Sequence, residues 1–196
     1  MRPSPRPRRS DQRRKELMPV VRGRSIRVLY DIPEIAARNA ELATEIAAAG
    51  YRDLLVISIL KGSFVFAADL IRALHAAGMA PEVEFISLSS YGAGTTSSGA
   101  VRVVKDIESE VAGRDVLLID DILESGRTLD FARKLMQERG AARVGVAVLL
   151  DKPGKRVAPM DADHVGFVCP DLFVVGYGMD VAHAFRELPF VGVVEE

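Results

Sequence analysis

The sequence predicts an α/β fold in which a mostly parallel, twisted sheet is flanked by helices. Short apolar runs of strand length alternate with segments of helical periodicity, which is the pattern of strand–helix–strand units. Glycine or proline marks many of the boundaries between these segments. The length of 196 residues, with 48% hydrophobic and 27% charged residues, suits one folded domain with a full core.

The expected strands are short apolar runs, several of them rich in valine and isoleucine. In chain order they are Ile26–Tyr30, Leu54–Ile59, Val83–Leu88, Val101–Val104, Val116–Ile119, Val144–Leu150, Val165–Val168, Phe173–Val175 and Val191–Val194. Alternation of such strands with helices implies a sheet that is covered on both faces.

Three helices are expected between these strands. Asp31 can cap the first helix, which ends at Gly50. The second follows the turn Leu60–Ser63 and ends at Gly78. The third follows the strand Val116–Ile119 and continues through Arg139.

The segment Tyr91–Gly99 is expected to be a mobile loop. It consists of glycine, serine, threonine and alanine after its first residue, with no large apolar side chain. Since a short strand is expected on either side, we expect this loop to join two antiparallel strands.

The charge is distributed unevenly, although the formal net charge is −1. Residues 1–15 contain seven basic residues, one acid and three prolines. We expect residues 1–20 to be a disordered basic tail and residues 21–196 to be the folded domain. A solvated extension is the simpler interpretation of the tail, and RNA binding or targeting is the alternative.

The single cysteine, Cys169, excludes an internal disulfide and is expected to be a small core residue beside Val165–Val168. One cysteine is consistent with a reducing compartment, and we expect a cytoplasmic protein. No apolar run approaches the length needed to span a bilayer, so we expect no membrane association.

The run Val116–Leu129, VLLIDDILESGRTL, is the most informative part of the chain. Four apolar residues precede the adjacent acids Asp120 and Asp121, and a turn containing Gly126 leads into an amphipathic helix. The first N–H groups of a helix lack partners within it, and its dipole is positive at that end, so this turn favours an anion. Acids beside an anion site suit a sugar phosphate, which offers both hydroxyls and phosphate.

Plainer interpretations of this run remain open. The two acids can be surface residues at a strand end, and the turn can be only a helix cap. Their position favours a site, because ligands of parallel sheets bind beyond the carboxyl ends of the strands. Three turns are expected to meet there, Leu60–Ser63, Asp120–Thr128 and Asp151–Gly154.

Val116–Leu129 resembles the ribose-phosphate-binding signature of type I phosphoribosyltransferases, which has two acids followed by a turn of Ser/Thr-Gly-x-Thr type. Further segments are similar to the hypoxanthine-guanine phosphoribosyltransferases, in that family's order and spacing. They are Leu60–Ser63, Ser90-Tyr91, Leu150–Pro153 and Asp171–Asp180 with Arg186. The resemblance runs from Ile26 to the C-terminus. It implies the type I phosphoribosyltransferase fold, with a small hood subdomain formed by N-terminal and C-terminal segments.

The resemblance implies roles for the residues of the run. Asp120 and Asp121 would hold the ribose 2′ and 3′ hydroxyls, directly or through Mg²⁺. The turn Ser125-Gly126-Arg127-Thr128 would cradle the 5′-phosphate. Glu124 stands where the family usually has aspartate, and we expect it to be the catalytic general base at purine N7.

The pyrophosphate and the purine would be held by residues outside the run. Lys61, Gly62 and Arg186 would contact pyrophosphate, with the Leu60–Lys61 peptide in cis. Asp180 would ligate a Mg²⁺ that is bound to pyrophosphate, since this ion prefers oxygen ligands.

The purine contacts follow from the same resemblance. Lys152 would donate to the 6-oxo group, which adenine lacks, so adenine should be rejected. Phe173 would stack on the base, and backbone groups of Val174 and Asp180 would read its edge.

These roles imply a purine salvage enzyme. It would transfer the 5-phosphoribosyl group from phosphoribosyl pyrophosphate to hypoxanthine or guanine, giving IMP or GMP and pyrophosphate. The Ser90–Gly99 loop, with Ser90 and Tyr91 beside the substrates, would close to exclude water from the ribosyl cation.

Two alternatives to this function stay open at this point. One is a phosphoribosyltransferase that prefers xanthine and guanine. The other is a non-catalytic regulator or RNA-binding protein with the same fold, for which the arginine-rich tail is the main support. For the salvage enzyme, we expect a homodimer or homotetramer, Mg²⁺ as cofactor and no nucleic-acid partner.

Overall fold

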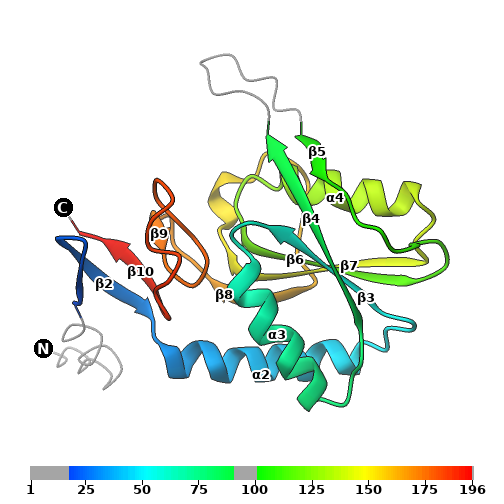
Figure 1. The fold of residues 1–196 in the computed structure, drawn as a ribbon, viewed down its shortest axis with the longest axis horizontal. Helices are drawn as coiled ribbons and strands as arrows, with labels where there is room; N and C mark the ends of the chain where they lie inside the picture. Colours follow the sequence, from blue (N-terminus) through cyan, green and yellow to red (C-terminus); the bar gives the residue numbers. More distant parts are fainter. Residues whose placement is uncertain (1–17, 91–100, 196) are drawn as a thin grey trace, which may run out of the picture.

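The computed structural model describes residues 18–90 and 101–195. Within them, six strands form the main sheet in the order β5-β4-β3-β6-β7-β8 (Figure 1). All neighbours are parallel except β4 and β5, which are antiparallel. The bounds are β3 Leu55–Leu60, β4 Glu82–Ser90, β5 Val101–Lys105, β6 Asp115–Leu123, β7 Arg143–Asp151 and β8 His164–Val168. The predicted mostly parallel sheet is confirmed. The predicted loop Tyr91–Gly99 lies outside the described residues.

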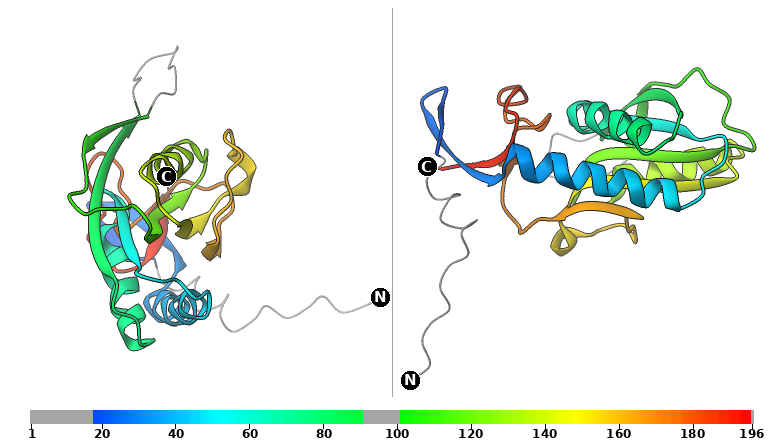
Figure 2. Two further views of the ribbon diagram at one scale, coloured as in Figure 1. Left: turned by 90° about the vertical axis from the view of Figure 1, so that its right-hand side faces the viewer. Right: turned by 90° about the horizontal axis from the view of Figure 1, so that it is seen from below.

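Helices cover both faces of this sheet, as predicted (Figures 1 and 2). On one face, α2 (Ile32–Ala48) and α3 (Phe64–Ala76) pack in a core cluster with alternate residues of β6, Leu117 and Ile119. On the other face, α4 (Arg127–Glu138) packs with the intervening residues, including Leu118. Successive side chains of a strand point to opposite faces, so an uninterrupted apolar run is what a strand buried on both faces requires.

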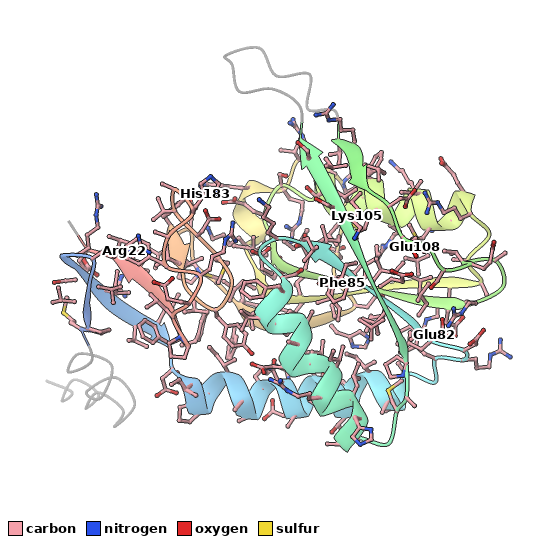
Figure 3. The ribbon with its side chains drawn as sticks, in the orientation of Figure 1. Arg22, Glu82, Phe85, Lys105, Glu108 and His183 are labelled. Carbon is pink, nitrogen blue, oxygen red and sulfur yellow. The ribbon has the colours of Figure 1, made fainter. Side chains whose placement is uncertain are left out.

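A second, small sheet joins segments from near the two ends of the described chain. Its antiparallel strands lie in the order β1-β2-β10-β9, with bounds β1 Val20–Val21, β2 Arg24–Tyr30, β10 Val191–Val194 and β9 Val174–Val175. We call this sheet and the loop 176–190 the hood. Figure 3 labels Arg22 and His183 at this end of the molecule. The predicted domain boundary near residue 20 remains a prediction, since residues 1–17 lie outside the described part of the chain.

Strand β6 is longer than the sequence predicts. We expected it to end at Ile119, before the two acids, but it continues to Leu123 and pairs there with Asp151 of β7. The predicted end was wrong because backbone pairing with β7 continues after the apolar run stops. Asp120 and Asp121 therefore lie on regular strand backbone, where their directions are fixed by the sheet.

Cys169 is only 2% exposed and belongs to the core cluster on the α2 side, which confirms its predicted structural place. Among the described residues, no helix has the length and apolar character that crossing a membrane requires.

Candidate functional site

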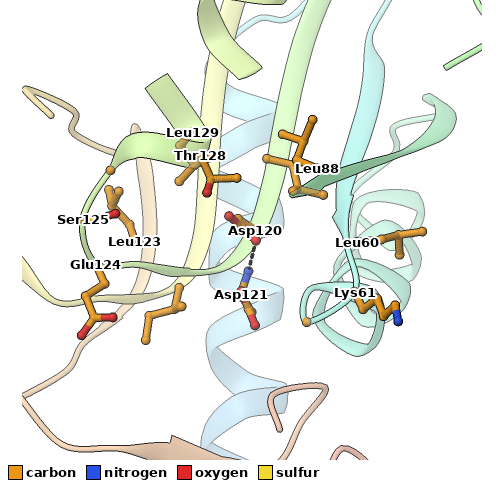
Figure 4. Close-up of a pocket in the computed structure, with 14 residues that line it drawn as sticks. Leu60, Lys61, Leu88, Asp120, Asp121, Leu123, Glu124, Ser125, Thr128 and Leu129 are labelled. Carbon is orange, nitrogen blue, oxygen red and sulfur yellow. Dashed lines mark hydrogen bonds between the residues drawn. The ribbon is translucent and has the colours of Figure 1, made fainter. Parts of the chain in front are cut away.

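Two adjoining cavities lie at the carboxyl end of β6 and together contain most of the predicted site. The first, about 300 Å³, is lined by residues that include Lys61, Gly62, Asp120, Ser125, Gly126 and Thr128 (Figure 4). The second, about 240 Å³, is lined by residues that include Lys152, Lys155, Phe173, Val174 and Asp180. Asp121, Ile122 and Glu124 line both cavities. The turns after β3 and β6 thus lie together at this edge of the sheet, as predicted, and the start of the turn after β7 lies beside them.

The acid pair is buried at the wall of the first cavity. Asp120 is only 8% exposed, and Asp121 is half-buried. The Asp121 N–H donates to Asp120 Oδ1 at 3.0 Å, as Figure 4 shows. Burial, and then the neighbouring charge of Asp121, raises the pKa of Asp120 well above its usual value. Burial likewise raises the pKa of Asp121, and hydrogen bonds to Asp120 and to the backbone, followed by the charge of Arg186, oppose this rise.

Gly62 allows the loop after β3 to approach the acid pair closely. A Cβ at this position would lie 1.8 Å from Asp121 Oδ2, so the Asp121 carboxylate would have to move. The preceding Leu60–Lys61 peptide is cis, as predicted. A Cβ at Gly178 of the hood would in turn lie 2.1 Å from the Gly62 carbonyl oxygen. Two glycines thus let the β3 loop fit between β6 and the hood.

The turn between β6 and α4 forms the floor of the first cavity. Gly126 precedes the helix with φ of +80°, a conformation that favours glycine. A Cβ there would also lie 3.0 Å from the Cβ of Met160. Ser125 and Thr128 line the cavity with Gly126 at the N-terminus of α4, which is the arrangement that binds anions. The exposed Arg127 is not among the lining residues.

The second cavity combines a buried cation with an exposed aromatic ring. Lys152 is only 6% exposed, and its Nζ lies 3.4 Å from Glu124 Oε1. Phe173 is 64% exposed, so its ring offers an uncovered apolar face beside the cavity. It lies just before β9 rather than within it, contrary to the predicted strand Phe173–Val175.

Lys155 is a residue of this cavity that the sequence interpretation missed. Its Nζ lies 2.7 Å from Asp171 Oδ1 and 3.7 Å from Glu124 Oε1. These carboxylates raise the pKa of Lys155, Asp171 most strongly. No motif marks this lysine, and its only signal is a position three residues after Lys152.

In the hood, Arg186 and Asp180 bind each other. Arg186 Nη2 lies 2.5 Å from Asp180 Oδ1, and Arg186 Nη1 donates to the Gly178 carbonyl oxygen at 2.6 Å. The other carboxylate oxygen of Asp180 accepts the His183 N–H at 2.8 Å. Asp180 lines the second cavity, whereas Arg186 lines a neighbouring groove between α2 and α3. The structure thus brings these two predicted residues together, at the edge of the two cavities.

The carboxylates in the first cavity are suited to a Mg²⁺ ion whose remaining ligands come from a bound phosphate and water. Among the described residues, no three histidine, cysteine or acidic side chains gather closely enough to hold a metal ion alone. The carboxylates of Asp120 and Asp121 point to the same cavity as the anion-binding turn. Mg²⁺ usually binds through one or two carboxylates plus substrate phosphates and water, so these residues fit that ion. Ser90 is the last residue of β4 and Tyr91 lies outside the described residues, so their predicted substrate contacts stay predictions.

Replacing Asp120 with asparagine should stabilise the unliganded protein at neutral pH. Because the pKa of Asp120 is raised in the folded state, wild type loses stability as the pH rises from the ordinary carboxyl pKa of about 4. Asp120→Asn removes this loss, so its advantage should grow above that pH and reach on the order of 1 kcal/mol or more. Urea unfolding of wild type and Asp120→Asn between pH 4 and pH 8 measures this difference in the free energy of unfolding. The exposed Asp161→Asn is the control, and equal behaviour of both variants would contradict a buried charge at Asp120.

Comparison with known proteins agrees with this geometry. The phosphoribosyl transferase domain profile matches residues 25–182. The hypoxanthine-guanine phosphoribosyltransferase of Bacillus subtilis is 43% identical over 171 residues, which cover 86% of this chain and 93% of that protein. A bifunctional TilS/HprT protein of Listeria innocua is also 43% identical, over 170 residues and 86% of this chain, but the match spans only 26% of its length.

The fold comparison gives the same family. A hypoxanthine phosphoribosyltransferase structure from Staphylococcus aureus matches with a TM-score of 0.80 and 38% identity, covering 86% of this chain and 90% of that one. The profile match, the relatives and the shared fold all indicate one family. The chain therefore belongs to the phosphoribosyltransferase family and, within it, to the hypoxanthine-guanine phosphoribosyltransferases.

Proposed function

We propose that this protein transfers the 5-phosphoribosyl group of phosphoribosyl pyrophosphate to N9 of hypoxanthine or guanine, releasing pyrophosphate. The observation that carries the proposal is the junction of the two cavities. One has an anion-binding turn beside two acids, the other has a buried lysine beside an exposed aromatic ring, and Glu124 lines both. A ribosyl group at this junction would have its phosphate on one side and the purine on the other.

The first cavity would bind the ribose 5-phosphate part of the substrate. The backbone N–H groups and hydroxyls of the turn Ser125–Thr128 would hold the phosphate. Asp120 and Asp121 would accept hydrogen bonds from the two ribose hydroxyls. Ligand binding would thereby give these buried carboxylates further hydrogen bonds, and this would favour their charged forms.

The leaving pyrophosphate would be bound at the loop after β3 and at the hood. Lys61 is exposed on the first cavity, and the guanidinium of Arg186 lies beside the Gly62–Gly178 contact, through its bond to the Gly178 carbonyl oxygen. Their charges would stabilise the negative charge that develops as the bond to pyrophosphate breaks. Bound Mg²⁺, held by the acid pair and Asp180, would supply further positive charge to the phosphate oxygens.

The second cavity would select the purine. Lys152 is nearly buried, so a base that places a donor rather than an acceptor against its ammonium is strongly disfavoured. The 6-oxo group of hypoxanthine or guanine accepts this hydrogen bond, whereas the 6-amino group of adenine does not. Phe173 would stack on the ring, and backbone groups of Val174 and Asp180 would contact its edge.

Glu124 would be the general base that takes the proton from purine N7. Its carboxylate lies between the two lysines of the second cavity, which hold it at the purine side of the junction. A small adjustment of the backbone or of the Glu124 rotamer would accommodate the extra methylene relative to aspartate. A general base must lie within hydrogen-bond distance of the proton that it removes. The distance from the Glu124 carboxylate to purine N7 would therefore affect the rate of proton transfer.

We also propose that the protein acts as a homodimer or homotetramer in the cytoplasm. Family resemblance supports the assembly, and the buried, unpaired thiol of Cys169 is consistent with a reducing compartment.

Pyrophosphate release should be observed with hypoxanthine and with guanine. Each purine is offered separately with phosphoribosyl pyrophosphate and Mg²⁺, and kcat/KM is compared across hypoxanthine, guanine, xanthine and adenine. Adenine should be lower by a factor on the order of 10⁴, because its 6-amino group presents a donor to Lys152 where the 6-oxo group presents an acceptor. A clear preference for xanthine over hypoxanthine would favour the alternative specificity. No release with any purine, together with RNA binding, would favour the regulator instead.

Glu124→Gln should lower kcat by a factor on the order of 10² or more, with small changes in both KM values. The amide keeps the size and hydrogen-bonding shape of the side chain but does not accept a proton, and general base catalysis contributes about 10²–10⁴. Steady-state kinetics measure the effect, and Glu124→Asp should keep most of the activity. The exposed Glu110→Gln is the matched control. Near-normal turnover by Glu124→Gln would refute the assignment of the base.

A further inference from the structure

Arg156 binds the backbone of the turn from the side away from the cavities. Its Nη1 lies 2.8 Å from the carbonyl oxygen of Leu123 and 2.8 Å from that of Glu124. Its Nη2 pairs with Asp151 Oδ1 at the end of β7. The side chain is 17% exposed, so these are largely buried, charge-assisted hydrogen bonds.

The next carbonyl group is held from the same segment. The oxygen of Ser125 accepts the N–H groups of Val157 and Ala158, at 2.9 and 3.0 Å. The Cδ atom of Arg156 also packs behind Gly126, 3.3 Å from where a Cβ would lie. Three consecutive carbonyl oxygens, from residue 123 to residue 125, are therefore bound to the segment 156–158.

This arrangement determines which polar groups face the phosphate. In a trans peptide the C=O and the following N–H point in opposite directions. Holding the carbonyl oxygens of Leu123, Glu124 and Ser125 on one side therefore turns the N–H groups of residues 124–126 to the other. A carbonyl oxygen that turned inward would repel an anion and remove a donor from its site.

Arg156 also connects the two halves of the site. It follows Lys152 by four residues, and the Lys152 N–H itself donates to the Leu123 carbonyl oxygen at 2.9 Å. The segment that carries the purine-binding lysine thus holds the backbone of Glu124 and of the phosphate turn. Neither bond is visible in the sequence, where Arg156 is one basic residue in the run Lys152–Arg156.

We propose that Arg156 is a positioning residue that orients the phosphate-binding turn and the backbone of Glu124. The proposal rests on the proposed function for the identity of the ligand, but its test is a binding measurement that needs no turnover. Arg156 does not line either cavity among the described residues, so its effect passes through the backbone that it binds.

The test compares binding of GMP with binding of guanosine, which lacks only the phosphate. Isothermal titration measures both for wild type, Arg156→Met and Arg156→Lys. Loss of the bonds that hold the turn should weaken GMP binding about tenfold or more in Arg156→Met. Guanosine binding should change by less than about threefold. Arg156→Lys keeps the charge but not the two-pronged geometry, so it should lose part of the same GMP selectivity.

Arg133→Met is the matched control. Arg133 also joins a backbone carbonyl, that of Asp161, to a carboxylate, that of Asp163, but it lies on α4 away from the turn. It should leave both affinities unchanged. The proposal is overturned if Arg156→Met weakens GMP and guanosine binding equally, or if Arg156→Lys binds GMP as wild type does. If Arg156→Met does not fold, Arg156→Lys decides alone. Absence of pyrophosphate release by wild type would refute the proposed function instead, independently of these affinities.

Discussion

The burial of two adjacent carboxylates at the end of β6 is the constraint on which the rest of the site depends. Asp120 and Asp121 lie on regular strand backbone, so the sheet holds them side by side although their charges repel. Gly62 approaches the pair so closely that a Cβ there would overlap the Asp121 carboxylate. Burial of both charges is unfavourable in the free protein, and it would become favourable if ribose hydroxyls and a cation bound to the pair, as we propose. The fold thus loses stability at the place where we propose that the substrate binds.

The surrounding elements hold that strand end and its turn in position. Gly62 lets the loop after β3 approach Asp121, and Gly178 lets the hood contact that loop. Arg156 and its neighbours hold the turn after β6 from the opposite side. Pyrophosphate, ribose and purine would therefore each meet a different segment of the chain, and all of these segments meet at one edge of the sheet.

The sequence predicted the fold class and the location of the site well, for identifiable physical reasons. The periods of the apolar residues indicate which segments are strands and helices, and the carboxyl edge of a parallel sheet is shared by all its strands. The end of β6 was missed because backbone pairing with β7, not side-chain character, extends it to Leu123. Lys155 and Arg156 were missed because their roles arise from contacts between β6 and the segment after β7, which no local motif encodes. The contact of Gly62 with Asp121 is likewise tertiary.

The carboxyl titration of Asp120 and Asp121 tests the central claim most directly. ¹³C NMR of the aspartate carboxyl carbons, followed against pH and assigned with Asp120→Asn, reports the protonation of the pair in the free protein and with GMP bound. Our account predicts that Asp120 titrates well above the usual carboxyl range of about 4 in the free protein, and that bound GMP lowers this pKa. An ordinary pKa for both carboxyl groups, unchanged by GMP, would contradict the account.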